Sequence, residues 1–157
     1  MIRNKGFTLM ELLIVITLLG ILSGLIFSML RNASPAARDI KRKQDVEAVK
    51  KSLEIYYSDV EAYPTVTSAM GMLWGGNISH PTAAKTYMQV LPRDPVSAMN
   101  YFYFVSADKQ SYKLYTCLEN TSDSAYSASI GTVEGANCGV GCSGICNYGI
   151  SSENTTP

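Results

Sequence analysis

Four cysteines are the side chains of this chain whose spacing most directly suggests chemistry. Cys117, Cys138, Cys142 and Cys146 all lie in the C-terminal third, and the last three follow a C-x3-C-x3-C pattern with glycines between them. Four thiols are enough to bind zinc, but this spacing differs from the paired C-x2-C of zinc modules. An even number of cysteines in a Gly- and Ser-rich region favours two disulfides formed in an oxidising compartment, with three pairings open. A bridge from Cys117 to one of the other three cysteines would fasten the C-terminal tail to the β-strand expected around Cys117.

The remaining side chains predict neither an enzyme nor a nucleic-acid-binding protein. The sequence contains no Ser/His/Asp set, no phosphate-binding loop and no metal cluster with matching spacing. His80 is the only histidine, so we expect it on the surface or hydrogen-bonded, without a metal. The 13 basic side chains balance the 13 acidic ones, which leaves no basic excess for nucleic acid. We therefore expect no catalytic residues and no cofactor.

Glu11 is a single acid near the start of an otherwise uncharged apolar run from Phe7 to Leu30. A carboxylate in hydrocarbon is costly unless it finds a partner or reaches the membrane surface. As a helix the run spans roughly 36 Å, enough to cross a bilayer. It is longer than the roughly 7–15 apolar residues of a signal peptide, and no Ala-x-Ala cleavage site follows. The pattern therefore predicts a retained membrane helix.

The helical pattern continues beyond Pro35, which is expected to kink the helix or to begin a second helical segment. One face of residues 36–61 is apolar, with side chains at three- and four-residue steps: Val46, Val49, Leu53, Tyr56, Tyr57 and Val60. The opposite face is predicted to be solvated and carries Lys43, Glu47, Lys50, Lys51 and Glu54. Tyr63-Pro64 should end the helix, because the residue before proline is pushed out of the α region.

The second half of the chain reads as a small head built on a β-hairpin. Residues 65–84 are rich in turn formers and predict a connecting loop. The sequence LPRDP, residues 91–95, predicts a rigid corner. Residues 101–105 and 112–118 alternate as strands, and SADKQS between them predicts the hairpin turn. The apolar face of the helix should pack against this sheet.

The N-terminus resembles that of type IV pilins and of the pseudopilins of type II secretion. The matching residues are RNKG, residues 3–6, followed by FTLMELLIVI, residues 7–16. The resemblance implies that a prepilin peptidase cleaves after Gly6 and that the new N-terminal residue, Phe7, is N-methylated. It also implies that Glu11 pairs with the N-terminal amine of a neighbouring subunit in a filament. Such a pair would set the stagger between subunits, as a buried polar residue sets register in a coiled coil.

The LPRDP corner resembles the Leu-Pro-x-Asp-Pro step of major pseudopilins, which bind Ca²⁺ in a loop after the strands through an Asp-Gly element and a later Asp. The corresponding region here, residues 117–139, offers Glu119, Asp123 and Glu134 but no Asp-Gly. The ligand pattern of the family is therefore missing, and we expect no calcium site.

Pattern and resemblance together predict an α+β pilin fold. Residues 1–6 form a leader peptide, and residues 7–62 form a long N-terminal α-helix with a transmembrane part over 7–30. Residues 63–157 form the head, in which a small antiparallel β-sheet packs on the amphipathic half of the helix and the tail holds the cysteines.

The implied function is that of a structural subunit of a type IV pilus or pilus-like filament, used for adhesion, motility, DNA uptake or secretion. Its partners would be copies of itself, the prepilin peptidase and methyltransferase, and an assembly platform in the inner membrane. Before assembly it would cross the inner membrane once with its head outside the cytoplasm. After assembly it would lie in an extracellular or periplasmic filament.

Three alternatives remain open. The chain could be a pseudopilin of a type II secretion system. It could be a signal-anchored surface protein that binds a ligand, keeps Met1 to Gly6 and forms no filament. A direct count of positive charges on either side of the apolar run would instead keep the head in the cytoplasm, where the four cysteines would serve a zinc module.

Overall fold

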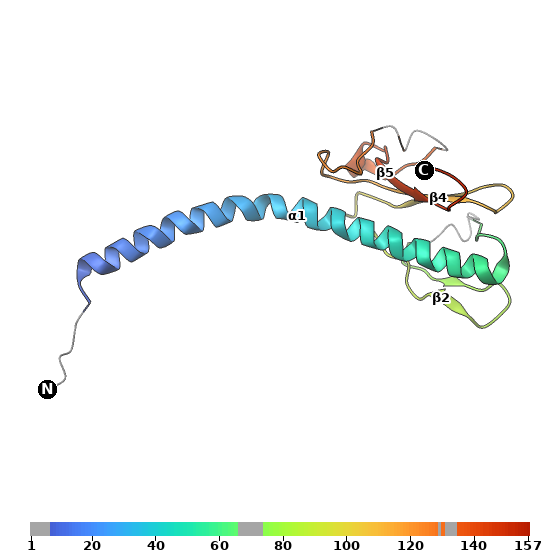
Figure 1. The fold of residues 1–157 in the computed structure, drawn as a ribbon, viewed down its shortest axis with the longest axis horizontal. Coiled ribbons are helices and arrows are strands. Elements are labelled where there is room, and N and C mark those ends of the chain that lie inside the picture. The colour runs from blue at the N-terminus through green and yellow to red at the C-terminus, as the bar shows by residue number, and fades with distance from the viewer. Residues whose placement is uncertain (1–6, 66–73, 129, 131–134) are drawn as a thin grey trace. The chain divides into compact units, whose positions relative to one another are not determined.

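The computed structural model describes residues 7–65, 74–128, 130 and 135–157, and the side chains of residues 25–33 lie outside this description. The chain forms two compact units, Met1–Ala36 and Ala37–Pro157. One helix, α1 (Leu9–Val60), supplies most of the first unit and enters the second (Figure 1). Pro35 lies inside α1, so the sequence after it continues this helix and does not begin a separate one.

The first unit presents apolar side chains around the whole helix. Every residue from Phe7 to Gly24 is exposed, and the large apolar ones from Phe7 to Leu22 keep 46–83% of their surface. In the part of the chain that the structure describes, none of the helices has the length and apolarity needed to span a bilayer. The stretch predicted to span the membrane, residues 7–30, reaches into the residues whose side chains are not described.

The second unit contains a three-stranded antiparallel sheet in the order β3-β4-β5. Its strands are β3 (Phe102–Val105), β4 (Tyr112–Thr116) and β5 (Tyr148–Ser151). Tyr103 pairs with Leu114 across β3 and β4, and Leu114 pairs with Ile150 across β4 and β5. The predicted hairpin of residues 101–105 and 112–118 is confirmed, with slightly shorter strands. The third strand, β5, lies in the tail and was not predicted.

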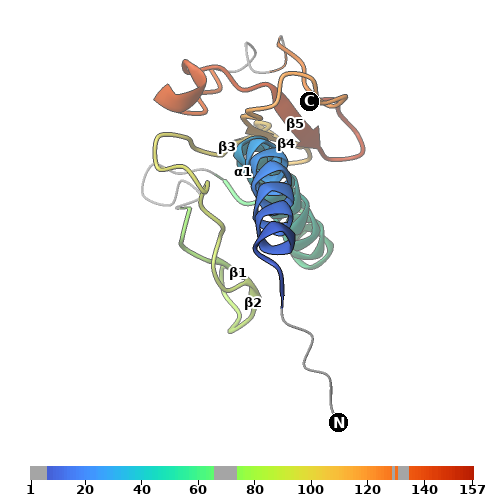
Figure 2. The same ribbon diagram turned by 90° about the vertical axis from the view of Figure 1, so that its left-hand side faces the viewer.

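A second, smaller sheet pairs β1 (Ile78–Ser79) with β2 (Thr86–Met88). The prediction that residues 65–84 form only a connecting loop is therefore wrong at β1. His80 follows β1, and its Nδ1 accepts hydrogen bonds from the backbone N–H groups of Thr82 and Ala83 at 3.1 and 2.8 Å. This small hairpin and the larger sheet lie on different sides of the C-terminal half of α1 (Figures 1 and 2).

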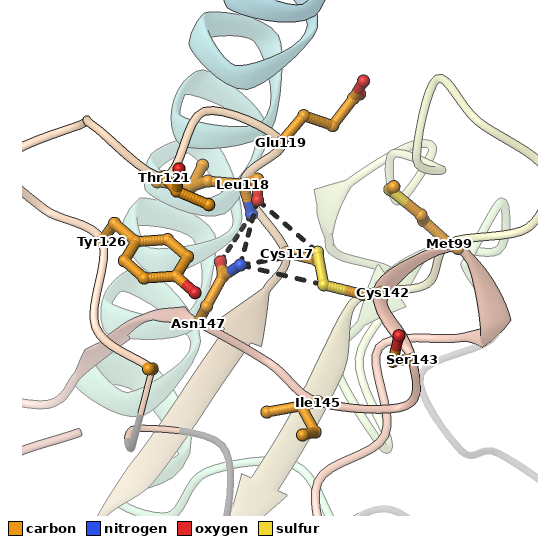
Figure 3. Close-up of a pocket in the computed structure, with 12 residues that line it drawn as sticks. Met99, Cys117, Leu118, Glu119, Thr121, Tyr126, Cys142, Ser143, Ile145 and Asn147 are labelled. Atoms are coloured by element: carbon orange, nitrogen blue, oxygen red, sulfur yellow. Dashed lines mark hydrogen bonds between the residues drawn. A yellow bond between two sulfur atoms is a disulfide. The ribbon is translucent and has the colours of Figure 1, made fainter.

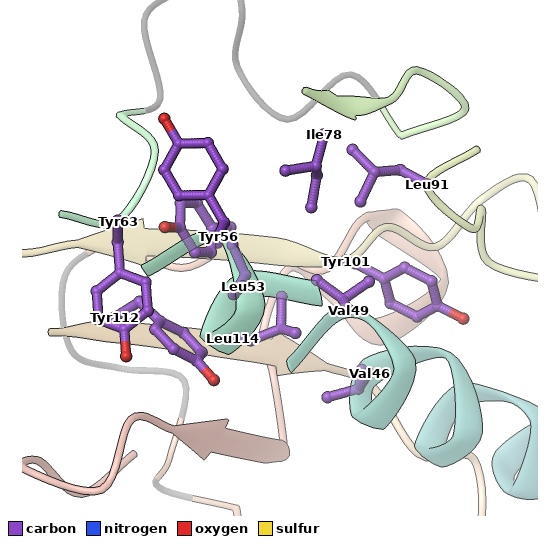
Figure 4. Packing of buried hydrophobic residues seen from close by; sticks show 11 residues of the cluster. Val46, Val49, Leu53, Tyr56, Tyr63, Ile78, Leu91, Tyr101, Tyr112 and Leu114 are labelled. Carbon is purple, nitrogen blue, oxygen red and sulfur yellow. The ribbon is translucent and has the colours of Figure 1, made fainter. Parts of the chain in front are cut away.

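The core of the second unit lies between α1 and β3–β4 (Figure 4). Its fully buried members are Val49, Leu53, Tyr112 and Leu114, each 0% exposed. The rest of the core comes from both layers and from the connections: Val46, Tyr56, Tyr63, Ile78, Leu91, Tyr101 and Tyr103. Burial of each large aliphatic side chain contributes about 1.5–3 kcal/mol. The predicted apolar face of the helix is therefore confirmed as the face that meets the sheet.

The face predicted to be solvated is only partly so. Glu47 and Lys51 are exposed, but Glu54 is half-buried. Its two carboxylate oxygens accept hydrogen bonds from the hydroxyls of Tyr63 and Tyr112 at 2.9 and 3.0 Å. Burial, followed by the interaction with Glu54, raises the pKa of both tyrosines, so both hydroxyls stay protonated as donors. Glu54 thereby ties the last turns of α1 to β4.

Candidate functional site

Glu11 has a partner on its own chain. The backbone N–H and the hydroxyl of Thr8 donate to Oε2 of Glu11 at 2.9 and 2.8 Å. The N–H of Glu11 donates back to the Thr8 hydroxyl oxygen at 3.3 Å. This reciprocal arrangement is a capping box at the first turn of α1, which satisfies N–H groups that the helix cannot satisfy itself. The Thr-x-x-Glu spacing of Thr8 and Glu11 is the local sequence signal for this capping box.

The capping box leaves one oxygen of the carboxylate for another donor. Both bonds from Thr8 reach Oε2, and among the described residues no donor reaches Oε1 of Glu11. Phe7 stands just before the helix and is 83% exposed. Gly6 and the rest of the predicted leader lie outside the described residues. The predictions of cleavage after Gly6 and methylation of Phe7 therefore stay predictions.

A buried arginine is the main electrostatic feature of the head. Arg42 is 0% exposed, although it is charged. Its Nε donates to Oδ2 of Asp94 at 2.7 Å and its Nη1 donates to Oδ1 of Asp39 at 2.7 Å. Nη1 also reaches Oε1 of Glu119 at 2.7 Å. We call Arg42, Asp39, Asp94 and Glu119 the Arg42 cluster.

The sequence did not predict this cluster, and it placed Asp94 only within the rigid corner of residues 91–95. One signal was present: Arg42 precedes Val46, Val49 and Leu53 by four, seven and eleven positions, and this spacing places it on the buried face. Asp94 does serve the turn as well, since its Oδ1 accepts the backbone N–H of Val96 at 2.8 Å. The partner of Arg42 therefore comes from the LPRDP corner.

Further donors complete the Arg42 cluster. Asp39 accepts the backbone N–H groups of Glu119 and Asn120 at 2.9 and 2.8 Å. Arg38 donates from its Nε to Glu119 at 2.7 Å. The hydrogen bond from Arg38, and then that from Arg42, lower the pKa of Glu119 to about 2 although burial acts in the opposite direction. The carboxylate of Glu119 is thus held in its charged form.

The loop after β4 has a second ionic contact with α1. Nζ of Lys43 lies 2.7 Å from each carboxylate oxygen of Asp123. The backbone N–H of Ala125 donates to the same carboxylate at 2.9 Å. These hydrogen bonds, that from Lys43 first, lower the pKa of Asp123. The sequence predicted Lys43 on a solvated face, but its ammonium group instead contacts Asp123.

These contacts bear on the calcium question raised by the family resemblance. Of the three acids in the corresponding region, Glu119 is bound by Arg38 and Arg42, and Asp123 is bound by Lys43. Glu134 lies outside the described residues. Within the residues that the structure describes, no group of three or more metal-binding side chains comes together. Glu119 and Asp123 do not fit a calcium ion, because their carboxylates already bind arginine and lysine side chains.

The four cysteines form two disulfides. Cys117 at the end of β4 is joined to Cys142, and Cys138 is joined to Cys146, with Cα–Cα distances of 6.2 and 5.2 Å. The bridge from Cys117 fastens the tail to the sheet, as expected. Asn147 reinforces it, because its amide accepts the N–H of Leu118 at 2.6 Å and donates to the carbonyl of the same residue at 2.9 Å (Figure 3).

A cavity of about 490 Å³ lies beside the first disulfide (Figure 3). Its apolar lining includes Met99, Leu118, Tyr126 and Ile145, and its polar lining includes Glu119 and Asn147. The cavity belongs to the same junction of sheet, loop and tail as the Arg42 cluster, since Glu119 takes part in both.

Two family models match the chain. The prokaryotic N-terminal methylation motif matches residues 1–27, and the type II secretion system (T2SS), protein G, matches residues 29–129. Together they cover the apolar segment, the amphipathic helix and the head as far as the loop after β4. No solved structure matches.

Curated relatives carry the same name. The type II secretion system core protein G of Aeromonas hydrophila is 34% identical over 101 residues, which cover 59% of this chain and 68% of the relative. That of Vibrio cholerae is 28% identical over 121 residues, which cover 73% of this chain and 80% of the relative. That of Escherichia coli K12 is 31% identical over 97 residues, covering 59% of this chain and 67% of the relative.

These matches confirm the predicted pilin-like subunit, and they agree with the secretion pseudopilin that was named as the alternative to a pilus subunit. The protein G match alone covers more than half of the 157 residues. The chain belongs to the protein G family of type II secretion systems, the pseudopilins within the type IV pilin family.

Proposed function

We propose that this chain is a structural, non-enzymatic subunit that assembles with copies of itself into the pseudopilus of a type II secretion system. The observation that carries the proposal is the first unit of the structure: a helix that exposes apolar side chains all round, from Phe7 to Leu22. Exposed apolar surface costs about 25 cal/mol per Å² in water. Such a helix needs lipid or other apolar helices around it.

Both environments follow from this requirement. Before assembly the N-terminal helix lies in the inner membrane, with the head on the outer side, where the two disulfides can form. During assembly an inner-membrane platform extracts the helix, and the helices of neighbouring subunits replace the lipid. The apolar surface stays out of water throughout. Extraction therefore does not have to supply the free energy of exposing this surface to water.

Glu11 gives the packing of these helices a fixed stagger in this proposal. Prepilin peptidase cleaves after Gly6 and releases the amine of Phe7, which is then methylated. That amine in a neighbouring subunit supplies the positive partner for Glu11, whose Oε1 accepts no hydrogen bond from the described residues. A buried carboxylate with no partner would disfavour every other stagger, because an uncompensated buried charge is strongly destabilising.

The test uses the cells that make the protein. The gene is deleted, and export of secreted enzymes and surface filaments are measured in parallel. The deletion is then complemented with the native gene, with Glu11→Gln, and with the matched control Glu47→Gln, which changes an exposed acid elsewhere on α1. We expect loss of export in the deletion strain, rescue by the native and control genes, and poor rescue by Glu11→Gln.

Two results would redirect the proposal. Normal export together with missing surface filaments would assign the chain to a type IV pilus. Mass spectrometry of the N-terminal peptide supplies the second check: we expect it to begin at Phe7 and to be one methyl group heavier than the unmodified peptide. A peptide that retains Met1 would favour the signal-anchored alternative, because the free amine for Glu11 would not exist.

A further inference from the structure

The Arg42 cluster joins parts of the head that are far apart in the sequence. Arg42 and Asp39 lie on α1, Asp94 lies 52 residues after Arg42 in the LPRDP corner, and Glu119 lies 77 residues after it. The side chains of Arg42 and Asp94 are 0% and 1% exposed. Their contact is the most buried ion pair of α1 among the described residues. The cluster therefore sits where the corner, the helix and the loop after β4 meet.

The hydrogen-bonding groups of the buried Arg42 are satisfied by the carboxylates around it. Arg42 meets Asp94 through two parallel hydrogen bonds, Nε to Oδ2 at 2.7 Å and Nη2 to Oδ1 at 2.9 Å. Nη1 bridges Asp39 and Glu119, and Arg38 supplies a second guanidinium to Glu119. The backbone N–H groups of Glu119 and Asn120 donate to Oδ1 and Oδ2 of Asp39, respectively. A buried ion group is stable only when its hydrogen bonds are satisfied in this way.

The same contacts position the loop after β4 by its backbone as well as by its side chains. Asp39 binds the N–H groups of Glu119 and Asn120. A few residues on, Lys43 binds Asp123. Asp39 of α1 therefore holds the backbone at the start of the loop. Arg42 and Lys43 of the same helix hold the loop's acidic side chains. A divalent cation near Glu119 or Asp123 would have to displace an arginine or a lysine that already neutralises the carboxylate.

We infer that the Arg42 cluster and the Lys43–Asp123 pair are a metal-free clamp that holds the loop after β4 in place, so that the folded head is independent of calcium. This departs from the calcium-binding loop that the family resemblance implies. The inference concerns the stability of the head and does not depend on the proposed role in secretion.

The single tryptophan of the chain makes a selective test possible. Trp74 packs edge-on against Tyr101, with ring centroids 5.1 Å apart. Tyr101 is buried, and its hydroxyl donates to Asp45 on α1 at 2.9 Å. Tryptophan fluorescence of the full chain in detergent micelles therefore reports unfolding of the head and not the behaviour of the apolar helix.

Thermal unfolding is followed by this signal with the disulfides intact, in millimolar calcium and in EDTA. We expect the Tm of the native chain to be the same in both. In contrast, Arg42→Met should lower Tm by roughly 10–20 °C in both solutions, because three carboxylates lose their common partner. The matched control Lys51→Met changes an exposed base on the same helix and should shift Tm by less than about 2 °C.

A milder variant covers the case in which Arg42→Met does not fold. Glu119→Gln keeps the size of the side chain and should lower Tm by several degrees without creating a difference between calcium and EDTA. Calcium that raises the Tm of the native chain by more than about 5 °C over EDTA would overturn the inference, since binding to the folded state stabilises it by mass action. A Glu119→Gln variant as stable as the native chain would overturn it too.

Discussion

Arg42 and Asp94 form a two-point contact inside the head, with Nε–Oδ2 and Nη2–Oδ1 distances of 2.7 and 2.9 Å and almost no exposure of either side chain. Because the guanidinium is planar, it matches both carboxylate oxygens at once. An ammonium group carries the same charge but has no such fork. The contact is therefore specific for arginine and not only for a positive charge.

Arg42→Lys separates the requirement for a positive charge from the requirement for a forked guanidinium. The lysine keeps the charge but cannot reach Asp39, Asp94 and Glu119 together, so it should destabilise the head by about 1.5–3 kcal/mol. The free energy of unfolding is measured by urea titration of the full chain in micelles, followed by Trp74 fluorescence. Lys51→Arg, at an exposed position, is the control and should have no measurable effect. A lysine variant as stable as the native chain would show that charge alone holds the cluster.

The pH dependence of stability should show a contribution from Glu119. Its pKa is lowered from 4.5 to about 2 in the folded head, chiefly by Arg38, with Arg42 and Asp39 as the other charged groups near it. A lowered pKa means that the unfolded chain binds the proton first as the pH falls. The stabilisation is therefore fully present above about pH 4.5 and is lost as the pH falls from there towards 2.

Urea titrations at a series of pH values would measure this effect. Glu119→Gln should be less stable than the native chain at neutral pH and should lose less stability between about pH 4.5 and 2. Asp123, whose pKa is also lowered, will contribute to the remaining slope in both proteins. If the stabilities of the native chain and Glu119→Gln fell in parallel between about pH 4.5 and 2, the pH dependence would not come from Glu119.

The long elements could be predicted from the sequence because their signals are local. The apolar run, the three- and four-residue steps of residues 46–60 and the alternation on both sides of SADKQS each lie within one element. The N-terminal motif was equally clear, and the cysteine pattern gave two disulfides without their pairing. These predictions needed no knowledge of contacts between distant segments.

The rest depends on contacts that are remote in sequence. No local pattern marks Asp94 or Glu119 as partners of Arg42, because they lie 52 and 77 residues away. Strand β5 was missed because it is only four residues long and a glycine separates its two strand formers, Tyr148 and Ile150. Its glycine is required by tertiary packing, since a Cβ on Gly149 would lie 2.6 Å from the ring of Tyr115. The capping box of Thr8 was a local signal that could have been found.

The core between α1 and the sheet should tolerate little loss of volume. Leu53→Ala removes a side chain that is 0% exposed and should cost about 2–5 kcal/mol of stability. Ile55→Ala, two positions away on the same helix, is the matched control, because Ile55 is 53% exposed, and it should cost no more than about 0.5 kcal/mol. Equal losses in urea titration would mean that the exposed face of α1 is also packed.

The two disulfides should contribute unequally. They join residues 25 and 8 positions apart, and closing the longer loop restricts the unfolded chain more. The Cys117→Ala/Cys142→Ala variant should therefore lose about 1 kcal/mol more than Cys138→Ala/Cys146→Ala. Urea titration of the two double variants beside the native chain measures the difference. A larger loss from the shorter loop would show that packing of the tail dominates over chain entropy.

The Thr8–Glu11 capping box should protect the first turn of α1. Thr8→Val removes the hydroxyl that contacts both the carboxylate and the N–H of Glu11, at a cost of about 0.5–2 kcal/mol. Amide exchange in the first turn, measured for the full chain in micelles, should then be roughly 2–30 times faster. Thr8→Ser keeps the hydroxyl and should restore slow exchange. Thr17→Val, which removes only a bond to the carbonyl of Ile14, should leave the first turn unchanged. If Thr8→Val exchanged as slowly as the native chain, the hydroxyl would not be what caps the helix.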